Sequence, residues 1–214
     1  MLEVFSTPAA RGALPASYDG PLHLVDDRAA AGLSETVHPQ GLVAVCAGVD
    51  RDPRSVLVPG VRLAVLLAEI NDPGNAGTVL RTADAAGATV VAFGRGSVDA
   101  YNGKCVRAAA GSHFHLDLVR DAPSEDVMKL ARGAGLRVLA TAGDGESDLD
   151  AEADSGALAA PTLWVYGNEA RGLPVALAER CDARVRIPLH GRAESLNLAA
   201  AAAVTLYASA RAQR

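Results

Sequence analysis

Three segments of the sequence combine glycine-bearing turns with polar side chains that could hold a ligand. They span residues 71–87 (NDPGNAGTVLRTADAAG), 163–174 (LWVYGNEARGLP) and 186–211 (RIPLHGRAESLNLAAAAAVTLYASAR). Because glycine has no Cβ, backbone amides at Gly167 and Gly172 could approach a ligand closely. The carboxylate of Glu169 could hydrogen-bond a hydroxyl or an amine. These residue types predict a ligand-binding site.

Each polar residue of these segments also has a purely structural interpretation. Arg81 could be a solvated arginine on a capped helix, paired with Asp84 three residues later. Glu169 could be an acid that the dipole of a nearby helix stabilises. Ser195 and Asn197 are ordinary N-cap residues for the alanine-rich run that follows them. Taken singly, none of these residues decides between structure and function.

Alternating strands and helices must position the three segments. From Arg62 onward, apolar runs predict strands at residues 63–70, 88–94, 113–119, 136–142, 162–167 and 183–189. Helices are predicted at residues 76–87, 124–134, 174–181 and 195–211. Near-continuous apolar strands joined by helices indicate an α/β fold with a mostly parallel, six-stranded sheet covered on both faces. Ligands bind beyond the carboxyl ends of such strands, where these segments and the TAGDG turn at 141–145 would converge.

The first 60 residues differ from the rest and predict a separate region. They hold six prolines, and short apolar pieces predict strands at 22–25 and 41–46. A short helix capped by Asp26 or Asp27 is expected between these strands. Four basic residues stand against seven acids, so the region does not resemble an RNA-binding surface. We therefore divide the chain into residues 1–60 and 61–214.

Composition and missing motifs argue against several classes of protein. Three widely spaced cysteines without a CxxC pair, and five scattered histidines, indicate neither a zinc site nor a disulfide framework, and we expect no metal. With no secretory signal and no apolar run of about 18 residues, we expect a cytoplasmic protein that does not enter a membrane. The absence of GxGxxG and GxxxxGK[ST] argues against the usual nucleotide-binding loops.

The net charge of −5 argues against binding nucleic acid through bulk positive charge. The distribution of charge matters more than its sum. The acids concentrate at residues 144–154, whereas basic residues lie in or beside the three segments: Arg81, Arg95, Lys104, Arg107, Arg171 and Arg192. These could equally be ordinary surface residues.

Together the three segments resemble the signature motifs of the SpoU (TrmH) family of RNA ribose methyltransferases, within the SPOUT superfamily. The first matches N-x-GxxxR through Asn75, Gly77 and Arg81, and the second matches GxExxG through Gly167, Glu169 and Gly172. The third matches IPxxG…SLNxxxAxxxxxY through Ile187, Pro188, Gly191, Ser195, Leu196, Asn197 and Tyr207. The stretch KCVRAAAGSHFHL at 104–116 is similar to the family's K-xVRxSxGxxF, and the likeness spans residues 62–211.

The resemblance implies a fold, a cofactor and an assembly. The C-terminal part of the sheet would form a trefoil knot, S-adenosylmethionine would bind in the knot, and the protein would be a homodimer with its terminal helices at the interface. The implied cofactor-binding residues are Thr141, Ala142, Gly143, Gly167, Ile187 and Leu196. The implied catalytic residues are Arg81, Asn75, Glu169, Ser195 and Asn197.

The reaction that the resemblance implies is methylation of a ribose 2′-hydroxyl in structured RNA. Family proposals make Arg81 the group that takes the hydroxyl proton, with help from an RNA phosphate. Because arginine is a very poor base, we favour a role for Arg81 as phosphate clamp and ligand of the 2′-oxygen. Asn75, Glu169, Ser195 and Asn197 would hold the ribose, the loop and the hydroxyl in register. Lys104, Arg107 and Arg171 are expected to contact RNA.

Several alternatives stay open within and beyond this resemblance. Ribosomal RNA is the favoured target because the minimal tRNA enzymes of the family usually have no N-terminal appendage, and a self-protecting, antibiotic-resistance methylase is a special case of it. Residues 1–60 are similar to only the later part of the family's ribosomal-protein-like substrate-binding domain, whose first forty residues or so have no counterpart here. This difference bears on RNA affinity and leaves the catalytic residues untouched. A tRNA methyltransferase, a non-catalytic RNA-binding or ribosome assembly factor, and a small-molecule α/β enzyme are the alternatives.

Overall fold

The computed structural model describes all 214 residues, and they form two compact units, Met1–Gly48 and Val49–Arg214. The division falls earlier in the chain than the boundary that we placed after residue 60. Backbone hydrogen bonds explain the difference, because the N–H groups of Val49 and Asp50 donate to the hydroxyl of Tyr101 at 2.6 and 3.0 Å. The N–H of Arg51 donates to the carbonyl of Leu118 at 2.7 Å. Residues 49–51 therefore belong to the second unit.

The first unit is a three-stranded sheet with one short helix. Its elements are β1 (Glu3–Ser6), η1 (Arg11–Ala13), β2 (Leu22–Leu24), α1 (Asp27–Leu33) and β3 (Leu42–Val45). The strands lie in the order β2-β1-β3, with β1 parallel to β2 and antiparallel to β3. The expected strands and helix are present, and Asp26 caps α1 by accepting from the N–H of Ala29 at 2.7 Å. The sequence analysis missed β1.

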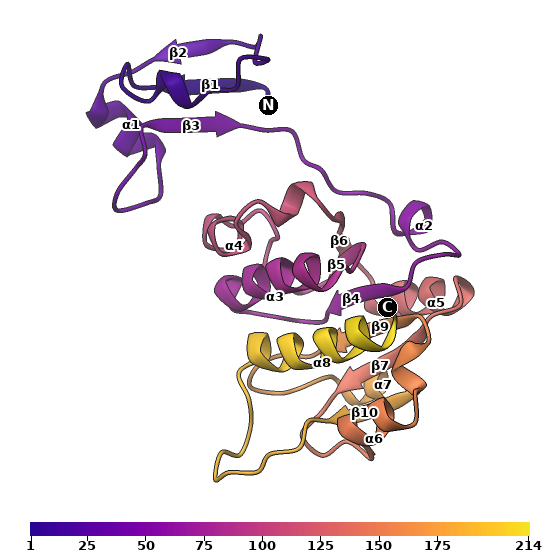
Figure 1. Cartoon of the computed structure of the whole chain (residues 1–214). Helices are drawn as coiled ribbons and strands as arrows, with labels where there is room; N and C mark the ends of the chain where they lie inside the picture. The colour runs from indigo at the N-terminus through magenta and orange to yellow at the C-terminus, as the bar shows by residue number, and fades with distance from the viewer. The chain divides into compact units, whose positions relative to one another are not determined.

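The second unit is an α/β domain built on a seven-stranded sheet (Figure 1). Its strands are β4 (Leu63–Leu67), β5 (Val90–Gly94), β6 (Asp117–Ala122), β7 (Arg137–Thr141), β8 (Ser147–Asp148), β9 (Thr162–Tyr166) and β10 (Ala183–Arg186). They lie in the order β6-β5-β4-β9-β7-β10-β8, and every pairing is parallel. The predicted parallel sheet is confirmed, and the two-residue β8 is the strand beyond the six expected.

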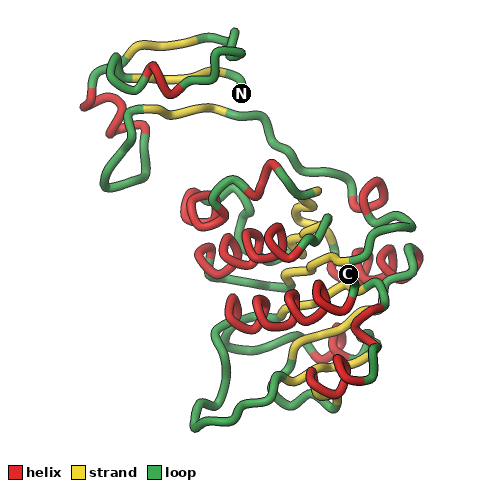
Figure 2. The backbone as a smooth tube through the Cα atoms, in the orientation of Figure 1, coloured by secondary structure: helices red, strands yellow, loops and turns green.

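Helices cover both faces of this sheet (Figure 2). They are α2 (Pro53–Val56), α3 (Pro73–Ala86), α4 (Gly103–Ala109), η2 (Ser112–Phe114), α5 (Ser124–Gly133), α6 (Leu149–Asp154), η3 (Ala157–Ala159), α7 (Val175–Ala178) and α8 (Leu198–Ala212). None of the helices is both long and apolar enough to cross a membrane.

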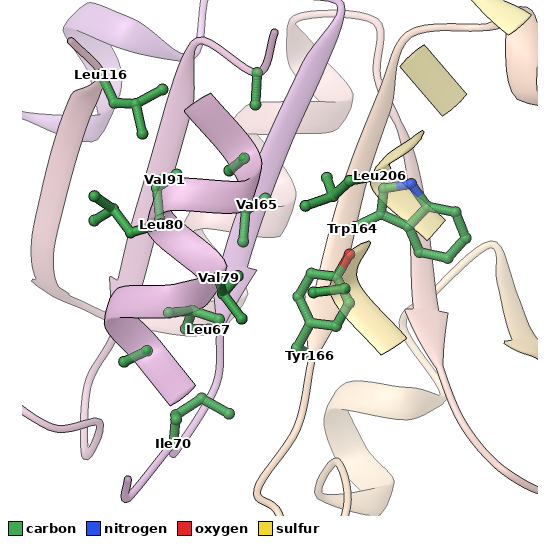
Figure 3. Close-up of a cluster of buried hydrophobic side chains, with 14 of the residues drawn as sticks. Val65, Leu67, Ile70, Val79, Leu80, Val91, Leu116, Trp164, Tyr166 and Leu206 are labelled. Carbon is green, nitrogen blue, oxygen red and sulfur yellow. The ribbon is translucent and has the colours of Figure 1, made fainter. Parts of the chain in front are cut away.

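Strand β4 shows why the sheet has two cores. Leu63, Val65 and Leu67 enter a cluster with α3, α4 and α8, whereas Ala64 and Leu66 enter a second cluster with α2, α5 and α7. Successive side chains of a strand point to opposite faces, so a strand covered on both faces must be apolar at every position. Figure 3 shows the first cluster, where side chains of β4 and β9 meet α3 and α8.

Two buried hydrogen bonds fix α8 on β9. The indole nitrogen of Trp164 donates to the hydroxyl of Ser209 at 2.9 Å, and the hydroxyls of Tyr166 and Thr205 lie 2.8 Å apart. Burial also raises the pKa of Tyr166, so its hydroxyl stays protonated. An aromatic side chain can be buried at little cost only when its polar atom has such a partner. The long alanine-rich helix is thus held against the strand that leads into the GNEARG turn.

Two local predictions are wrong. Residues 113–119 do not form one strand, because Gly111 has a φ of 97° and starts the single turn η2, and β6 begins only at Asp117. His113 is buried there and its Nε2 lies 2.8 Å from the carbonyl oxygen of Ala100. Helix α3 begins at Pro73, three residues before the start that we predicted at residue 76, because proline is tolerated at the start of a helix and Asp72 supplies the cap.

Candidate active site

A cavity of about 530 Å³ lies at the carboxyl ends of β7, β9 and β10. The turns that follow these strands form its wall, together with the start of α8. All six residues predicted for the cofactor line it: Thr141, Ala142, Gly143, Gly167, Ile187 and Leu196. Glu169 and Ser195 line it as well. Of the four segments that we expected to converge, three line this cavity, and residues 71–87 do not.

The GNEARG turn after β9 is closed by its own backbone. The N–H of Asn168 donates to the carbonyl of Gly172 at 2.9 Å, and the reverse bond is 2.8 Å long. Gly172 has a φ of 70°, which favours glycine, and a Cβ at Gly167 would overlap the backbone of Gly172 and Leu173. We expected these glycines to let amides approach a ligand, but their first role is to let the turn fold back on itself.

The side chain of Asn168 anchors this turn to the end of β4. Its amide nitrogen donates to the carbonyl of Glu69 at 2.9 Å, and its Oδ1 accepts from two backbone N–H groups of the turn. Asn168 is buried, and all of these bonds are internal to the protein. Glu69 itself has a φ of 56°, a left-handed conformation that is costly outside glycine. The direction in which Glu169 projects is therefore fixed by two neighbouring strands.

The carboxylate of Glu169 links the GNEARG turn to the start of α3. Its Oε2 accepts from the N–H of Asn71 at 3.3 Å, and its Oε1 accepts from the N–H of Asp72 at 3.2 Å. The same Oε1 accepts from the side-chain amide of Asn75 at 3.3 Å. Three N–H donors on one carboxylate hold it in position. The geometry makes Glu169 a bridge between two turns.

Asn197 extends this bridge to α8. Its Nδ2 donates to Oδ1 of Asn75 at 3.1 Å, and its Oδ1 accepts from the N–H of Ala199 at 2.9 Å, which caps the helix. A chain of hydrogen bonds thus runs from Asn197 through Asn75 to Glu169. Ser195 precedes α8 in an exposed loop and lies on the cavity wall. The structure brings together four of the five predicted catalytic residues.

Arg81 stands apart from this network. Its side chain is exposed on α3, makes no hydrogen bond or ion pair, and does not line the cavity. The alternative that Arg81 pairs with Asp84 is wrong, because Asp84 lies 2.8 Å from Nδ1 of His115. An arginine with no protein partner keeps all its donors available to another molecule.

The three residues predicted to bind RNA lie on helix α4 and in the GNEARG turn. Lys104 on α4 pairs with Asp72 at 3.2 Å, and Arg171 in the GNEARG turn lies 3.5 Å from Glu69. Arg107 is exposed on α4. The backbone N–H of Asn75, followed by the ammonium of Lys104, lowers the pKa of Asp72. Lys104 and Arg171 therefore each have an acidic partner within the protein, which an RNA phosphate would have to displace or share.

Several residues of the cavity wall were not predicted, among them Asp148, Glu194 and Leu198. Asp148 belongs to the acidic stretch at residues 144–154, which we did not include among the site residues. It reaches the cavity because β8 pairs with β10, which places its Oδ2 3.2 Å from Nη2 of Arg186. Two strands separated by more than thirty residues create this contact. No local pattern in the sequence indicated it.

A protein-family model described as the SpoU rRNA methylase family matches residues 62–207. The chain belongs to this family. Residues 62–207 contain the whole seven-stranded sheet, the cavity and the hydrogen-bond chain from Asn197 to Glu169. The candidate site therefore lies within the part of the chain that the family model matches.

Named relatives and solved structures agree with this membership. The chain is 38% identical over 185 residues to the 23S rRNA (guanosine(2553)-2′-O)-methyltransferase RlmP of Bacillus subtilis, covering 86% of this chain and 71% of the relative. The crystal structure of the SpoU methyltransferase AviRb from Streptomyces viridochromogenes matches with a TM-score of 0.85 at 30% identity, over 99% and 82% of the two chains. An AdoMet-bound rRNA methyltransferase from Sinorhizobium meliloti matches with a TM-score of 0.85 at 33% identity, over 98% and 79%.

The bridge through Glu169 allows a specific test in this SpoU methylase. We expect Glu169→Gln to lower methyl transfer by about tenfold to a hundredfold, because one of its acceptor oxygens becomes a donor that faces other donors. Asn75→Ala should have a similar effect because it breaks the same chain. Glu169 is exposed and Asn75 is half-buried, so the free energy of unfolding should fall by less than about 1 kcal/mol. Thermal unfolding would check this, and a large drop in Tm would show that both residues serve only stability.

Proposed function

We propose that this chain transfers a methyl group from S-adenosylmethionine to a ribose 2′-hydroxyl of ribosomal RNA. As a SpoU methylase it is an RNA ribose 2′-O-methyltransferase that uses S-adenosylmethionine. The observation that carries our assignment of the site is the cavity at the sheet edge, whose wall holds Glu169 and Ser195 beside all six expected cofactor residues.

The cavity fits S-adenosylmethionine in size and in the chemistry of its wall. Its volume of about 530 Å³ lies within the range of small-molecule sites. Ile187, Leu196 and Leu198 offer apolar surface to an adenine ring, and a Cβ at Gly143 would meet no atom within 4 Å, so that turn leaves space. We further propose the family's trefoil knot for this chain, since the loop between β10 and α8 forms one side of the cavity.

The residues of the chain would mainly orient the reacting groups. When bound, S-adenosylmethionine supplies an activated methyl group, so the protein must hold the ribose oxygen in line with it. Such positioning can contribute roughly 7–11 kcal/mol. Arg81 would bind the RNA phosphate and the 2′-oxygen, and Ser195 would contact the hydroxyl. Since Glu169 and Asn75 already hold each other, we propose that they keep the turns in register.

Ribosomal RNA is the substrate that we favour over tRNA. Residues 1–48 form a compact unit of their own, and the match to RlmP covers 86% of this chain, more than the methylase unit alone would supply. An added unit would extend the contact with a large RNA. We propose Lys104, Arg107 and Arg171 as phosphate contacts of the methylase unit. An rRNA substrate also agrees with the cytoplasmic location that we expect.

The decisive experiment incubates the protein with unmodified rRNA and tRNA transcripts and methyl-labelled S-adenosylmethionine. We expect label in the rRNA alone, as a 2′-O-methyl nucleoside at one position that mass spectrometry of nuclease fragments can map. Label in tRNA would overturn the rRNA assignment. No label in either RNA, with no binding of S-adenosylmethionine in calorimetry, would indicate a non-catalytic RNA-binding or ribosome assembly factor.

We also propose that the chain forms a homodimer through α8. Ala200, Val204, Tyr207 and Arg211 form one exposed stripe of this helix, with Val204 43% and Tyr207 50% exposed. The opposite face is buried on β9 and α3. Exposed apolar residues at helical spacing are what a second copy could cover.

Val204→Glu should therefore convert a dimer into a monomer, because the new charge would be buried without a partner at the interface. Light scattering coupled to size exclusion would measure a mass near 21.9 kDa for the variant and twice that for the parent. Val175 on α7 is 73% exposed and offers a matched control. Val175→Glu should leave the mass unchanged, and a parent protein that is already monomeric would contradict the proposal.

A further inference from the structure

Four charged side chains line the cavity, and three of them are acidic. They are Asp148, Glu169 and Glu194, against Arg186 alone, so the wall carries a net charge of −2. Two of the acids already have hydrogen-bond or ion-pair partners within the protein. Asp148 lies 3.2 Å from Arg186 and caps α6, and Glu169 accepts the three N–H bonds described above. The single cation is likewise held, by Asp148 and by the carbonyl of Gly145 at 3.1 Å.

Glu194 is the exception among these four side chains. It lies in the exposed loop between β10 and α8, next to Ser195, and makes no hydrogen bond or ion pair. At this position a carboxylate repels the phosphates of an RNA substrate. It attracts a cation in the cavity for the same reason. Of the net charge of −2, one negative charge is on Glu169, which accepts from three N–H groups, and the other is on Glu194, which has no partner.

We propose that Glu194 is a specificity-determining residue that makes the cavity favour the methyl donor over the demethylated product. The proposal depends on the S-adenosylmethionine site proposed above. In the transfer, the ribose oxygen forms a bond to the methyl carbon, the hydroxyl proton passes to solvent water, and the electron pair of the broken carbon–sulfur bond stays on sulfur. S-Adenosylmethionine thus has a net charge of +1 and S-adenosylhomocysteine has none.

The two ligands share the adenosine, the ammonium and the carboxylate groups. A protein charge that interacts with these shared groups changes both affinities equally, and only an interaction with the sulfonium changes their ratio. An exposed carboxylate acting over several ångströms through a largely aqueous medium changes an affinity by about threefold to tenfold. A charge of this size would favour donor binding and product release in each turnover.

The test is isothermal titration calorimetry of the full chain with S-adenosylmethionine and S-adenosylhomocysteine. We expect Glu194→Gln to weaken donor binding about threefold to tenfold at low salt and to leave product binding unchanged. Sinefungin, which carries an amine in place of the methyl sulfonium, should weaken like the donor. Glu194→Asp keeps the charge and should keep most of the preference.

Glu179→Gln is the matched control, because Glu179 is an exposed acid at the end of α7, outside the cavity and without an ion pair. This variant should leave both affinities unchanged. Equal weakening of donor and product by Glu194→Gln, or an unchanged ratio at low salt, would overturn the proposal while leaving the proposed function standing. Failure of the parent protein to bind either ligand would overturn both.

Discussion

Replacing Arg81 with alanine is expected to lower methyl transfer to RNA by roughly a thousandfold, the scale of losing one charge-stabilising donor at a reacting oxygen. The affinity for S-adenosylmethionine should stay within about twofold, because a surface change away from a site alters free energies by a few tenths of a kcal/mol. Arg81 has no protein partner and does not line the cavity, so neither the fold nor the cofactor depends on it. Single-turnover methylation and calorimetry would measure the two quantities.

Two controls separate the role of Arg81 from that of positive charge in general. Arg81→Lys keeps the charge but not the planar fork that binds a phosphate through two bonds, and it should restore only part of the rate. Arg180→Ala removes an exposed arginine, paired with Glu125 at 3.5 Å and outside the cavity, and should have no effect on rate. Comparable losses of methyl transfer and cofactor affinity in Arg81→Ala would instead place this residue at the cofactor.

Gly167→Val is expected to abolish binding of S-adenosylmethionine and also to destabilise the fold by about 2–4 kcal/mol. The reason is the closed GNEARG turn, because any Cβ at residue 167 overlaps the backbone of Gly172 and Leu173. The turn must open, and Asn168 and Glu169 then lose their positions. Calorimetry and thermal unfolding would measure the two effects in one preparation.

Gly143→Ala is the control for Gly167→Val, because it adds a side chain to the cavity without disturbing the fold. Gly143 also lines it, but a Cβ there would meet no atom within 4 Å. This variant should keep the Tm of the parent, so any loss of cofactor binding would report occupied space alone. If Gly167→Val bound the cofactor normally, the assigned position of the cavity would be wrong.

The sequence predicts the parallel sheet well because its central strands β4, β5 and β9 are buried on both faces and are therefore apolar at nearly every residue. It predicts short elements poorly. Strand β1 has four residues and β8 two, and helices α4 and α6 have seven and six, too few for a repeating apolar pattern to appear. His113 shows a related limit of sequence patterns. The alternation of residues 113–119 predicted a strand, but His113 is buried in a helical turn, where its ring contacts the carbonyl of Ala100.

At the candidate site, the sequence identifies the residues but not the bonds between them. The motif segments supplied Asn75, Glu169 and Asn197, and the structure joins them although they lie as many as 122 residues apart. The contacts of Glu169 with the N–H groups of Asn71 and Asp72 use backbone atoms, which carry no sequence signal. The pair Asp148–Arg186 depends on strand pairing at the sheet edge. Such features follow only from tertiary structure.

Helix α8 presents one side to its own protomer and the other to solvent. On its buried side, Ser209 and Thr205 hydrogen-bond to side chains of β9, the strand that ends just before Gly167. Its first turn is capped by Asn197, which also belongs to the hydrogen-bond chain. A dimer formed through the exposed side of α8 would therefore stabilise the same helix that holds the hydrogen-bond chain of the candidate site in place. Specific activity would then depend on protein concentration. It would fall on dilution, because the protomers separate and α8 loses its contacts with the second copy.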